Sequence, residues 1–245
     1  MFNSCLRAVK NHLVRPTCER FGIGLFSSVG LEHLDLQLVS LLKGKRGGVF
    51  IEAGANNGVC QSNTYYFERV LGWTGILVEP TPELYEQCRK LRKGSKVFNA
   101  ALVREGYPNP TVQLEQAGLM SVVNDGAINA EVIDAHIRNG LEIQRLNAKA
   151  AIEVTARTLQ SILDECSVRH VDLLSLDVEG YELEVLKGVA FDKTTFDWIL
   201  VEVRDSNEAE IDSLLEQHGY LWDRIWRSRS YANKVYRRRI PSGTT

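Results

Sequence analysis

Short apolar runs alternate with amphipathic stretches along the first half of the chain. The runs at 48–53, 75–79 and 96–103 have the length and composition of buried strands, and stretches with helical spacing at 62–71 and 82–93 separate them. Strands and helices that alternate at such short intervals are typical of parallel βαβ units. We therefore expect a parallel sheet.

The second half continues this pattern around a less regular middle. The run VDLLSLDV at 171–178 predicts a fourth parallel strand, and WILVEV at 198–203 predicts a fifth. The last two strands, at 220–226 and 234–238, predict a closing antiparallel pair. The expected fold class is thus α/β, with a mostly parallel sheet and a C-terminal antiparallel hairpin. The other expected elements are a strand at 111–116, a loop at 118–126, a helix at 127–148, a strand at 151–157, and helices at 159–166, 182–187 and 207–218.

The same pattern gives the domain boundaries. Residues 1–46 are expected to form an N-terminal arm and helix, residues 47–240 one α/β domain, and residues 241–245 a tail. The irregular stretch at about 104–150 predicts an insertion on the substrate side of the domain.

The arm carries Leu6, Val9, Leu13 and Val14 at near-helical spacing. This spacing predicts an amphipathic helix. Its apolar side would pack on the domain or on a second subunit, and in the second case the chain forms a homodimer.

Composition excludes several classes of protein. Hydrophobic residues make up 44% and charged residues 24% of the 245, which excludes a disordered chain, a collagen-like fibre and a coiled coil. No run reaches the ~18 apolar residues of a transmembrane helix, so no transmembrane segment is expected. The 29 basic and 31 acidic residues leave a formal charge of −2, which gives no reason to expect a nucleic-acid partner.

The five cysteines are widely scattered and include no CxxC pair. A disulfide framework or a zinc site needs closer, paired spacing. Free thiols in a reducing compartment fit better, so a cytoplasmic location is expected. The polar start of the chain, which lacks the apolar region of a signal peptide, agrees with this expectation.

Acidic residues end four of the predicted strands. Glu52, Glu79, Asp177 and Glu202 hold these positions, and Glu179 follows Asp177 by two residues. A single acid at such a place would be explained as a loop residue, or as a negative charge that stabilises the start of a helix. In an open α/β sheet, however, ligands lie outside the carboxyl ends of the strands. Four acids at equivalent ends therefore favour one shared site.

The acidity of this site narrows the class of ligand. A dinucleotide pyrophosphate needs backbone N–H groups without nearby anions, and both Glu52 and the spacing Gly54-x-Asn56-x-Gly58 depart from the GxGxxG pattern. These departures argue against one alternative, a nicotinamide-dependent oxidoreductase. An acidic cleft suits S-adenosylmethionine, which carries a sulfonium, an ammonium group and ribose hydroxyls. Clustered carboxylates also bind Mg²⁺, but no histidine-rich spacing supports a metal site and none is predicted.

Four segments of the chain resemble the FkbM-type family of S-adenosylmethionine-dependent methyltransferases: FIEAGANNG, GILVEPTPELYEQC, VFNAAL and DLLSLDVEGYELEVLKG. The resemblance runs from about Val49 to Glu202, and its specific part is GANNG together with LDVEGYE. It implies a Rossmann-like class I methyltransferase fold and O-methylation of a hydroxyl on a sugar or secondary metabolite, so that the partner is a small-molecule or glycan acceptor. The other alternative is a non-catalytic protein that keeps the cofactor-binding fold. The joint presence of four acids argues against it: Glu52, Glu79, Asp177 and Glu179.

The resemblance also implies roles for individual residues. Glu79 would bind the cofactor ribose, Asn99 would lie near the adenine, and Asp177 would face both the cofactor and the substrate. The residues implied around S-adenosylmethionine are Glu52, Gly54, Ala55, Asn56, Gly58, Ser62, Asn63, Glu79, Pro80, Asn99, Ala100 and Asp177.

A hydroxyl is a poor nucleophile, so a general base would assist its methylation. Asp177 and Glu179 lie where this base is expected, although both positions also suit cofactor binding. His136, in the irregular insertion, is a third and lesser candidate. The candidate catalytic residues are thus Asp177, Glu179 and His136.

Overall fold

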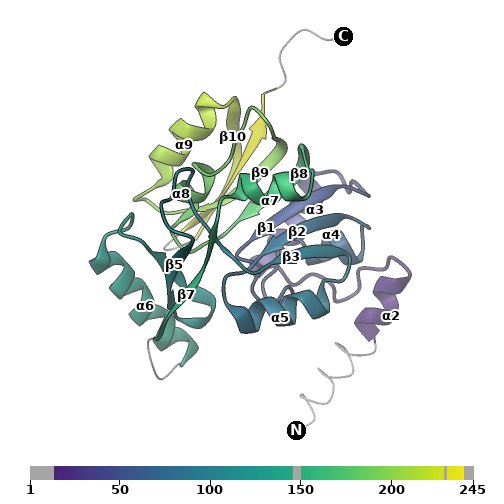
Figure 1. Ribbon diagram of the computed structural model, residues 1–245. Coiled ribbons are helices and arrows are strands. Elements are labelled where there is room, and N and C mark those ends of the chain that lie inside the picture. Colours follow the sequence, from purple (N-terminus) through teal and green to yellow (C-terminus); the bar gives the residue numbers. More distant parts are fainter. Residues whose placement is uncertain (1–13, 146–149, 229–230, 240–245) are drawn as a thin grey trace.

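The computed structural model describes residues 14–145, 150–228 and 231–239 (Figure 1). Its main sheet has seven strands in the order β10-β11-β9-β8-β1-β2-β3. Strands β3, β2, β1, β8 and β9 are parallel, and β11 and β10 form an antiparallel pair at one edge, which confirms the predicted fold class. The strands are β1 (Val49–Ala53), β2 (Thr74–Val78), β3 (Ser95–Phe98), β8 (His170–Leu176), β9 (Thr195–Val203), β10 (Tyr220–Arg227) and β11 (Ala232–Arg238).

The order of the strands reverses at β1. The chain first builds outward through β2 and β3, and later returns to place β8 on the other side of β1. Such a switch point leaves a crevice outside the carboxyl ends of the two central strands, where ligands of open α/β sheets bind. The topology therefore locates the candidate site at the ends of β1 and β8.

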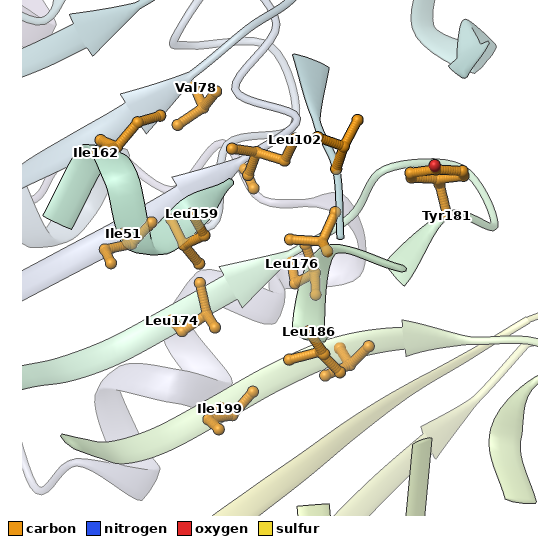
Figure 2. Close-up of a cluster of buried hydrophobic side chains, with 14 of the residues drawn as sticks. Ile51, Val78, Leu102, Leu159, Ile162, Leu174, Leu176, Tyr181, Leu186 and Ile199 are labelled. Atoms are coloured by element: carbon orange, nitrogen blue, oxygen red, sulfur yellow. The ribbon is translucent and has the colours of Figure 1, made fainter. Parts of the chain in front are cut away.

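Alternation of side chains along the strands builds a hydrophobic core on each face of the main sheet. Phe50 of β1 packs on one face with α3, α4 and α5, whereas Ile51 packs on the other with α7, α8 and α9. In Figure 2, Ile51, Leu174 and Ile199 from three adjacent strands line the second core beside Leu159 of α7. These helices are α3 (Leu34–Leu41), which follows the short helix η2 (Leu31–His33), α4 (Tyr65–Arg69), α5 (Pro82–Leu91), α7 (Leu159–Glu165), α8 (Glu182–Leu186) and α9 (Glu208–Gln217).

A second sheet, at the lower left of Figure 1, has four strands in the order β4-β7-β5-β6. Helix α6 (Ala130–Gln144) packs on it through Ile133 and Ile137, which belong to a small core with Ala117 and Val122. The remaining elements of this unit are β4 (Ala101–Leu102), β5 (Thr111–Gln116), η3 (Gly118–Met120), β6 (Val122–Asn124) and β7 (Ala150–Arg157).

Two segments differ from the elements expected. The run 96–103, expected as one strand, divides into β3 and β4, which belong to different sheets. Between them, the side-chain amide of Asn99 donates to the carbonyl oxygens of Glu79 and Pro80, both at 2.9 Å, and this fixes the turn. The stretch 118–126, expected as a loop, contains η3 and β6, because alternate side chains of β6 pack into two different cores.

Glu19 anchors the N-terminal segment. Helix α2 (Arg15–Arg20) holds this buried carboxylate where it accepts hydrogen bonds from Ser27 Oγ (2.9 Å), the Tyr65 hydroxyl (3.2 Å) and Arg69 Nε (3.0 Å). Because Tyr65 and Arg69 belong to α4, these bonds fix the segment to the main domain.

Some expectations fall on residues that the structure does not describe. The arm positions Leu6, Val9 and Leu13, and the tail at 241–245, lie outside the described residues. Within the described part of the chain, no helix has the length and apolar character needed to cross a bilayer. The cysteines described there are free thiols: Cys18, Cys60, Cys88 and Cys166.

Candidate active site

A cavity of about 850 Å³, its open mouth included, lies at the switch point of the main sheet. One wall consists of residues that directly follow β1, β2 and β8, and the opposite wall comes from η3, β5 and β6 of the second sheet. Three of the predicted strand-end acids line it, namely Glu79, Asp177 and Glu179, whereas Glu52 and Glu202 do not. The topology thus brings part of the predicted acidic set together.

Gly54 forms the contact between the ends of β1 and β8. Its φ is +81°, and a Cβ at this position would lie 1.8 Å from the carbonyl oxygen of Asp177. A larger residue would therefore push the two strand ends apart, and the positive φ also favours glycine. The cavity floor depends on this close approach.

Glu79 joins the end of β2 to the loop after β1. Its Oε2 accepts a hydrogen bond from the backbone N–H of Asn56 (2.8 Å), and its Oε1 accepts one from Thr81 (2.9 Å). Burial raises the pKa of Glu79, and these two N–H groups oppose the rise. Each oxygen keeps one lone pair, so the carboxylate can still accept two hydrogen bonds from a ligand.

Glu52 lies beneath the loop and faces away from the cavity. Its carboxylate accepts hydrogen bonds from Ser62 Oγ (2.7 Å), the backbone N–H of Asn63 (2.7 Å) and Thr64 Oγ1 (2.6 Å). The three donors are held in a turn, so α4 begins at Tyr65, later than the expected residue 62. The structure therefore gives Glu52 a role in shaping the loop.

Arg92, directly after α5, completes this buried polar cluster. Its fully buried guanidinium donates to Glu68 Oε2 (3.0 Å), Thr64 Oγ1 (2.9 Å), Ser62 Oγ (3.1 Å) and the carbonyl oxygen of Gly58 (2.9 Å). It also lies 3.5 Å from the Glu52 carboxylate. Sequence reasoning missed Arg92, because the run RKLRKG resembles an ordinary solvated helix end.

The cluster also revises two arguments made from the sequence. A Cβ on Gly58 would lie 2.6 Å from Arg92 Cγ, so this glycine makes room for the arginine stem. Arg92 also lies beside Glu52, and because it shares its single positive charge with Glu68 it offsets the charge of Glu52 in part.

The other residues expected around the cofactor divide between the cavity and its surroundings. Ala55 is buried in a hydrophobic core, and the Asn63 amide donates to Ser175 Oγ at 3.2 Å. Asn99 is exposed and braces the turn after β3. The expected cofactor residues that line the cavity are Gly54, Asn56, Ser62, Glu79, Pro80, Ala100 and Asp177.

Asp177 is the least satisfied acid of the site. Its Oδ1 is shielded from solvent and has no hydrogen-bond partner among the described residues. Burial, and then the nearby charges of Glu202, Glu179 and Glu182, raise the pKa of Asp177 well above its ordinary value. Burial and the same kind of like-charge repulsion raise the pKa of Glu202 to about 8. These two acids therefore bind a proton more readily than ordinary carboxyl groups do.

Arg204 opposes that repulsion. Its Nη2 lies 2.8 Å from Glu179 Oε2 and 3.5 Å from Glu202 Oε1. The backbone turn beneath is held by buried Glu182, whose Oε1 accepts hydrogen bonds from the N–H groups of Val178 (3.0 Å) and Gly180 (2.9 Å). Arg204 and Glu182 thus fix the segment that presents Asp177 and Glu179.

His136 of α6 reaches this cluster from the insertion without lining the cavity. Its Nδ1 lies 3.2 Å from Arg204 Nη1, and its Nε2 lies 3.2 Å from Glu179 Oε2. Because a guanidinium only donates hydrogen bonds, Nδ1 must accept and the ring proton must reside on Nε2. Both ring nitrogens therefore face other side chains, and His136 links α6 to the ends of β8 and β9.

One group in the described part of the chain has the spacing of metal ligands, and it lies elsewhere. His170, Asp172 and Asp197 meet at the opposite, N-terminal ends of β8 and β9. The ammonium group of Lys45 already bonds Asp172 there.

Replacement of Arg92 tests the structural role of the buried cluster. Arg92→Leu is expected to lower the free energy of unfolding by roughly 3–5 kcal/mol, because Glu52 and Glu68 lose their buried partner. Arg92→Lys should lose less, because it keeps the charge without the forked geometry. Urea denaturation measures both, with Arg89→Leu, exposed near the end of α5, as an unaffected control. An Arg92→Leu protein as stable as the wild type would contradict this role.

Comparison with solved structures finds chains of similar architecture. They include precorrin-6y C5,15-methyltransferase from Geobacter metallireducens (10% identity, TM-score 0.49, 89% of this chain and 97% of that one). Fibrillarin from Aeropyrum pernix, solved with bound S-adenosyl-L-methionine, also matches (14% identity, TM-score 0.44, 82% and 74% covered). At such low identities, the similarity says nothing about the reaction or the acceptor of this protein. The comparison with curated proteins finds no match.

The family comparison covers most of the domain. The family model described as the methyltransferase FkbM domain matches residues 52–222, which include every residue that lines the cavity. The strand order and the cavity at its switch point are those of the class I methyltransferase fold. The chain therefore belongs to the FkbM methyltransferase family, and it is a methyltransferase that uses S-adenosylmethionine.

Proposed function

We propose that the protein is an O-methyltransferase whose acceptor is a hydroxyl of a sugar or of a secondary-metabolite-like compound. The observation that carries this proposal is the buried Oδ1 of Asp177, a hydrogen-bond acceptor without a partner among the described residues on the cavity wall. A buried unpaired acceptor is costly, and a ligand donor such as a hydroxyl removes that cost.

The chemistry of the near wall fits S-adenosylmethionine. Glu79 offers two free lone pairs for the ribose hydroxyls, and Ala100 with Leu102 offers apolar surface for the adenine ring. Asn56 and Ser62 lie on the loop side, where the amino-acid end of the cofactor would bind. When bound, the cofactor supplies an electrophilic methyl group on a positively charged sulfur, which acids near the cavity stabilise.

Asp177 is the proposed general base. A carboxylate with a raised pKa is a stronger proton acceptor, and Asp177 lines the cavity with one oxygen free. Glu179 is paired with Arg204, so we assign it the role of orienting the acceptor. His136 faces Arg204 and Glu179, and we propose that it positions them.

The far wall suggests the kind of acceptor. Leu114, Leu119 and Val123 present apolar side chains, and Ser121 adds a hydroxyl. This mixture suits a compound with both an apolar face and hydroxyl groups. We propose that the insertion at 104–150 forms the acceptor side of the site. The free thiols favour a reducing, cytoplasmic setting for the reaction.

Calorimetric titration with S-adenosylmethionine tests the cofactor map. In Glu79→Gln the new amide N–H₂ must face the N–H of Asn56 or of Thr81, so the loop is disturbed and an acceptor is lost. Binding is expected to weaken about tenfold or more. Glu83→Gln, an exposed acid on α5 outside the cavity, is the matched control and should bind like the wild type. Equal affinity of Glu79→Gln and wild type would contradict the map.

A screen of hydroxyl compounds with methyl-labelled S-adenosylmethionine tests the activity itself. The acceptor that the screen identifies then allows kcat/KM to be measured as a function of pH. A base must be deprotonated, so kcat/KM should rise with pH through the raised pKa of Asp177. Glu202→Gln removes a like charge, which lowers the pKa of Asp177 and moves the acid limb to lower pH. Asp177→Asn should lower kcat/KM by about a hundredfold or more. If Glu202→Gln leaves the acid limb of the pH profile in place, or moves it to higher pH, that result would contradict Asp177 as the base.

A further inference from the structure

The N-terminal segment exposes an unusual number of apolar side chains. Among the described residues, six of the twelve large exposed hydrophobic side chains lie between residues 21 and 36. Phe21 is 75% exposed, Ile23 54% and Leu25 48%, all on the loop that follows α2, and Leu31 and Leu36 lie just beyond. Apolar side chains that gather in this way mark an interaction surface.

Positive charge is concentrated in the same part of the chain. Residues 1–46 contain seven Lys and Arg against three acids, whereas the remaining 199 residues contain 22 against 28. Two of the three acids, Glu19 and Asp35, are buried and hydrogen-bonded. Among the described residues of the segment, Arg20, Lys43 and Arg46 are exposed against one exposed acid, Glu32, whereas Arg15 pairs with Glu19 and Lys45 with Asp172.

The basic groups flank the apolar loop closely. Arg20 is exposed directly before Phe21. A Cβ placed on Gly22 would lie 3.5 Å from Arg46 Nη2, so Arg46 lies beside the loop, and Lys43 is exposed nearby in sequence. An apolar tip bordered by arginine side chains is a pattern by which proteins bind the interface of an anionic membrane.

The loop is anchored at both ends and runs from the N-terminal side of the main sheet toward Gln61. Glu19 fixes one end through α4, and Asp35 fixes the other by accepting from the Val29 N–H at 2.9 Å. Gly30 then pairs with Gln61, which lines the cavity. The apolar tip therefore lies beside Arg46 and Val70, before the N-terminal ends of β1 and β2, and the segment reaches a residue of the cavity only at Gly30.

We propose that residues 20–36, with Lys43 and Arg46, form a docking face for an anionic phospholipid surface. Phe21, Ile23 and Leu25 enter the headgroup region, while the flanking basic side chains contact lipid phosphates and carboxylates. This inference needs no particular acceptor and does not depend on the role of Asp177.

Flotation of the full chain with vesicles tests the proposal. We expect the wild type to float with phosphatidylcholine vesicles that contain phosphatidylserine, less so with pure phosphatidylcholine, and least at high salt. The double variant Phe21→Gln/Ile23→Gln should lose about tenfold or more of this partitioning. Arg20→Glu should lose the part of the vesicle binding that depends on phosphatidylserine.

Matched controls separate docking from general surface effects. Leu91→Gln on α5 and Ile143→Gln on α6 remove side chains that are 49% and 65% exposed elsewhere, and both should float like the wild type. Melting temperature and S-adenosylmethionine binding should stay unchanged in all variants. A wild type that does not float, or a double variant that floats equally well, overturns the proposal. The proposal is also overturned if the wild type binds no vesicles and instead forms a dimer that Phe21→Gln/Ile23→Gln dissociates. In that case the face binds a second copy of the chain.

Discussion

The guanidinium group of Arg92, buried with Glu52 and Glu68, organises the loop that forms the cavity floor. It reaches the carbonyl oxygen of Gly58 and the hydroxyls of Ser62 and Thr64, so it holds the whole connection between β1 and α4. Buried charges are tolerated only when they are paired and fully hydrogen-bonded, which makes this arrangement sensitive to any loss of a partner. The position of Asn56, and through it the bond to Glu79, follows from that loop.

The acids at the strand ends divide into two kinds as a result. Glu52 shares the positive charge of Arg92 with Glu68 and shapes the backbone, whereas Glu79 keeps acceptor capacity toward the cavity. At the other side of the switch point, Arg204 offsets only part of the charge of the acids around it, so the pKa of Asp177 stays raised. The two sides of the cavity therefore differ: Glu79 keeps two acceptor positions on one side, and Asp177 has a raised pKa on the other.

Much of the fold could be predicted from the sequence, because strand periodicity is a local property. The parallel strands and the terminal hairpin follow directly from apolar runs such as 171–178 and 198–203. The division of 96–103 could not be predicted, since it depends on the bonds of Asn99 to residues about 20 positions earlier. Contacts between distant segments leave no local pattern.

The candidate site was predictable to a similar degree. The position of Glu79 and Asp177 at strand ends is enough to place them at one crevice. The role of Arg92 and the linkage of His136 to Arg204 required the structure, because a basic residue at a helix end and a histidine in an insertion have many ordinary explanations. The side to which a strand-end acid points, which separates Glu52 from Glu79, is likewise set by tertiary packing.

A crystal structure of the protein with S-adenosylmethionine bound would show which of the strand-end acids contacts the cofactor. We expect the ribose hydroxyls to lie within hydrogen-bond distance of the Glu79 carboxylate, and no atom of the cofactor to contact Glu52 or Arg92. The loop from Gly54 to Thr64 should keep its present bonds to Arg92. A cofactor atom bonded to Glu52, or a ribose bound away from Glu79, would contradict the division between a structural cluster and a ligand-binding acid.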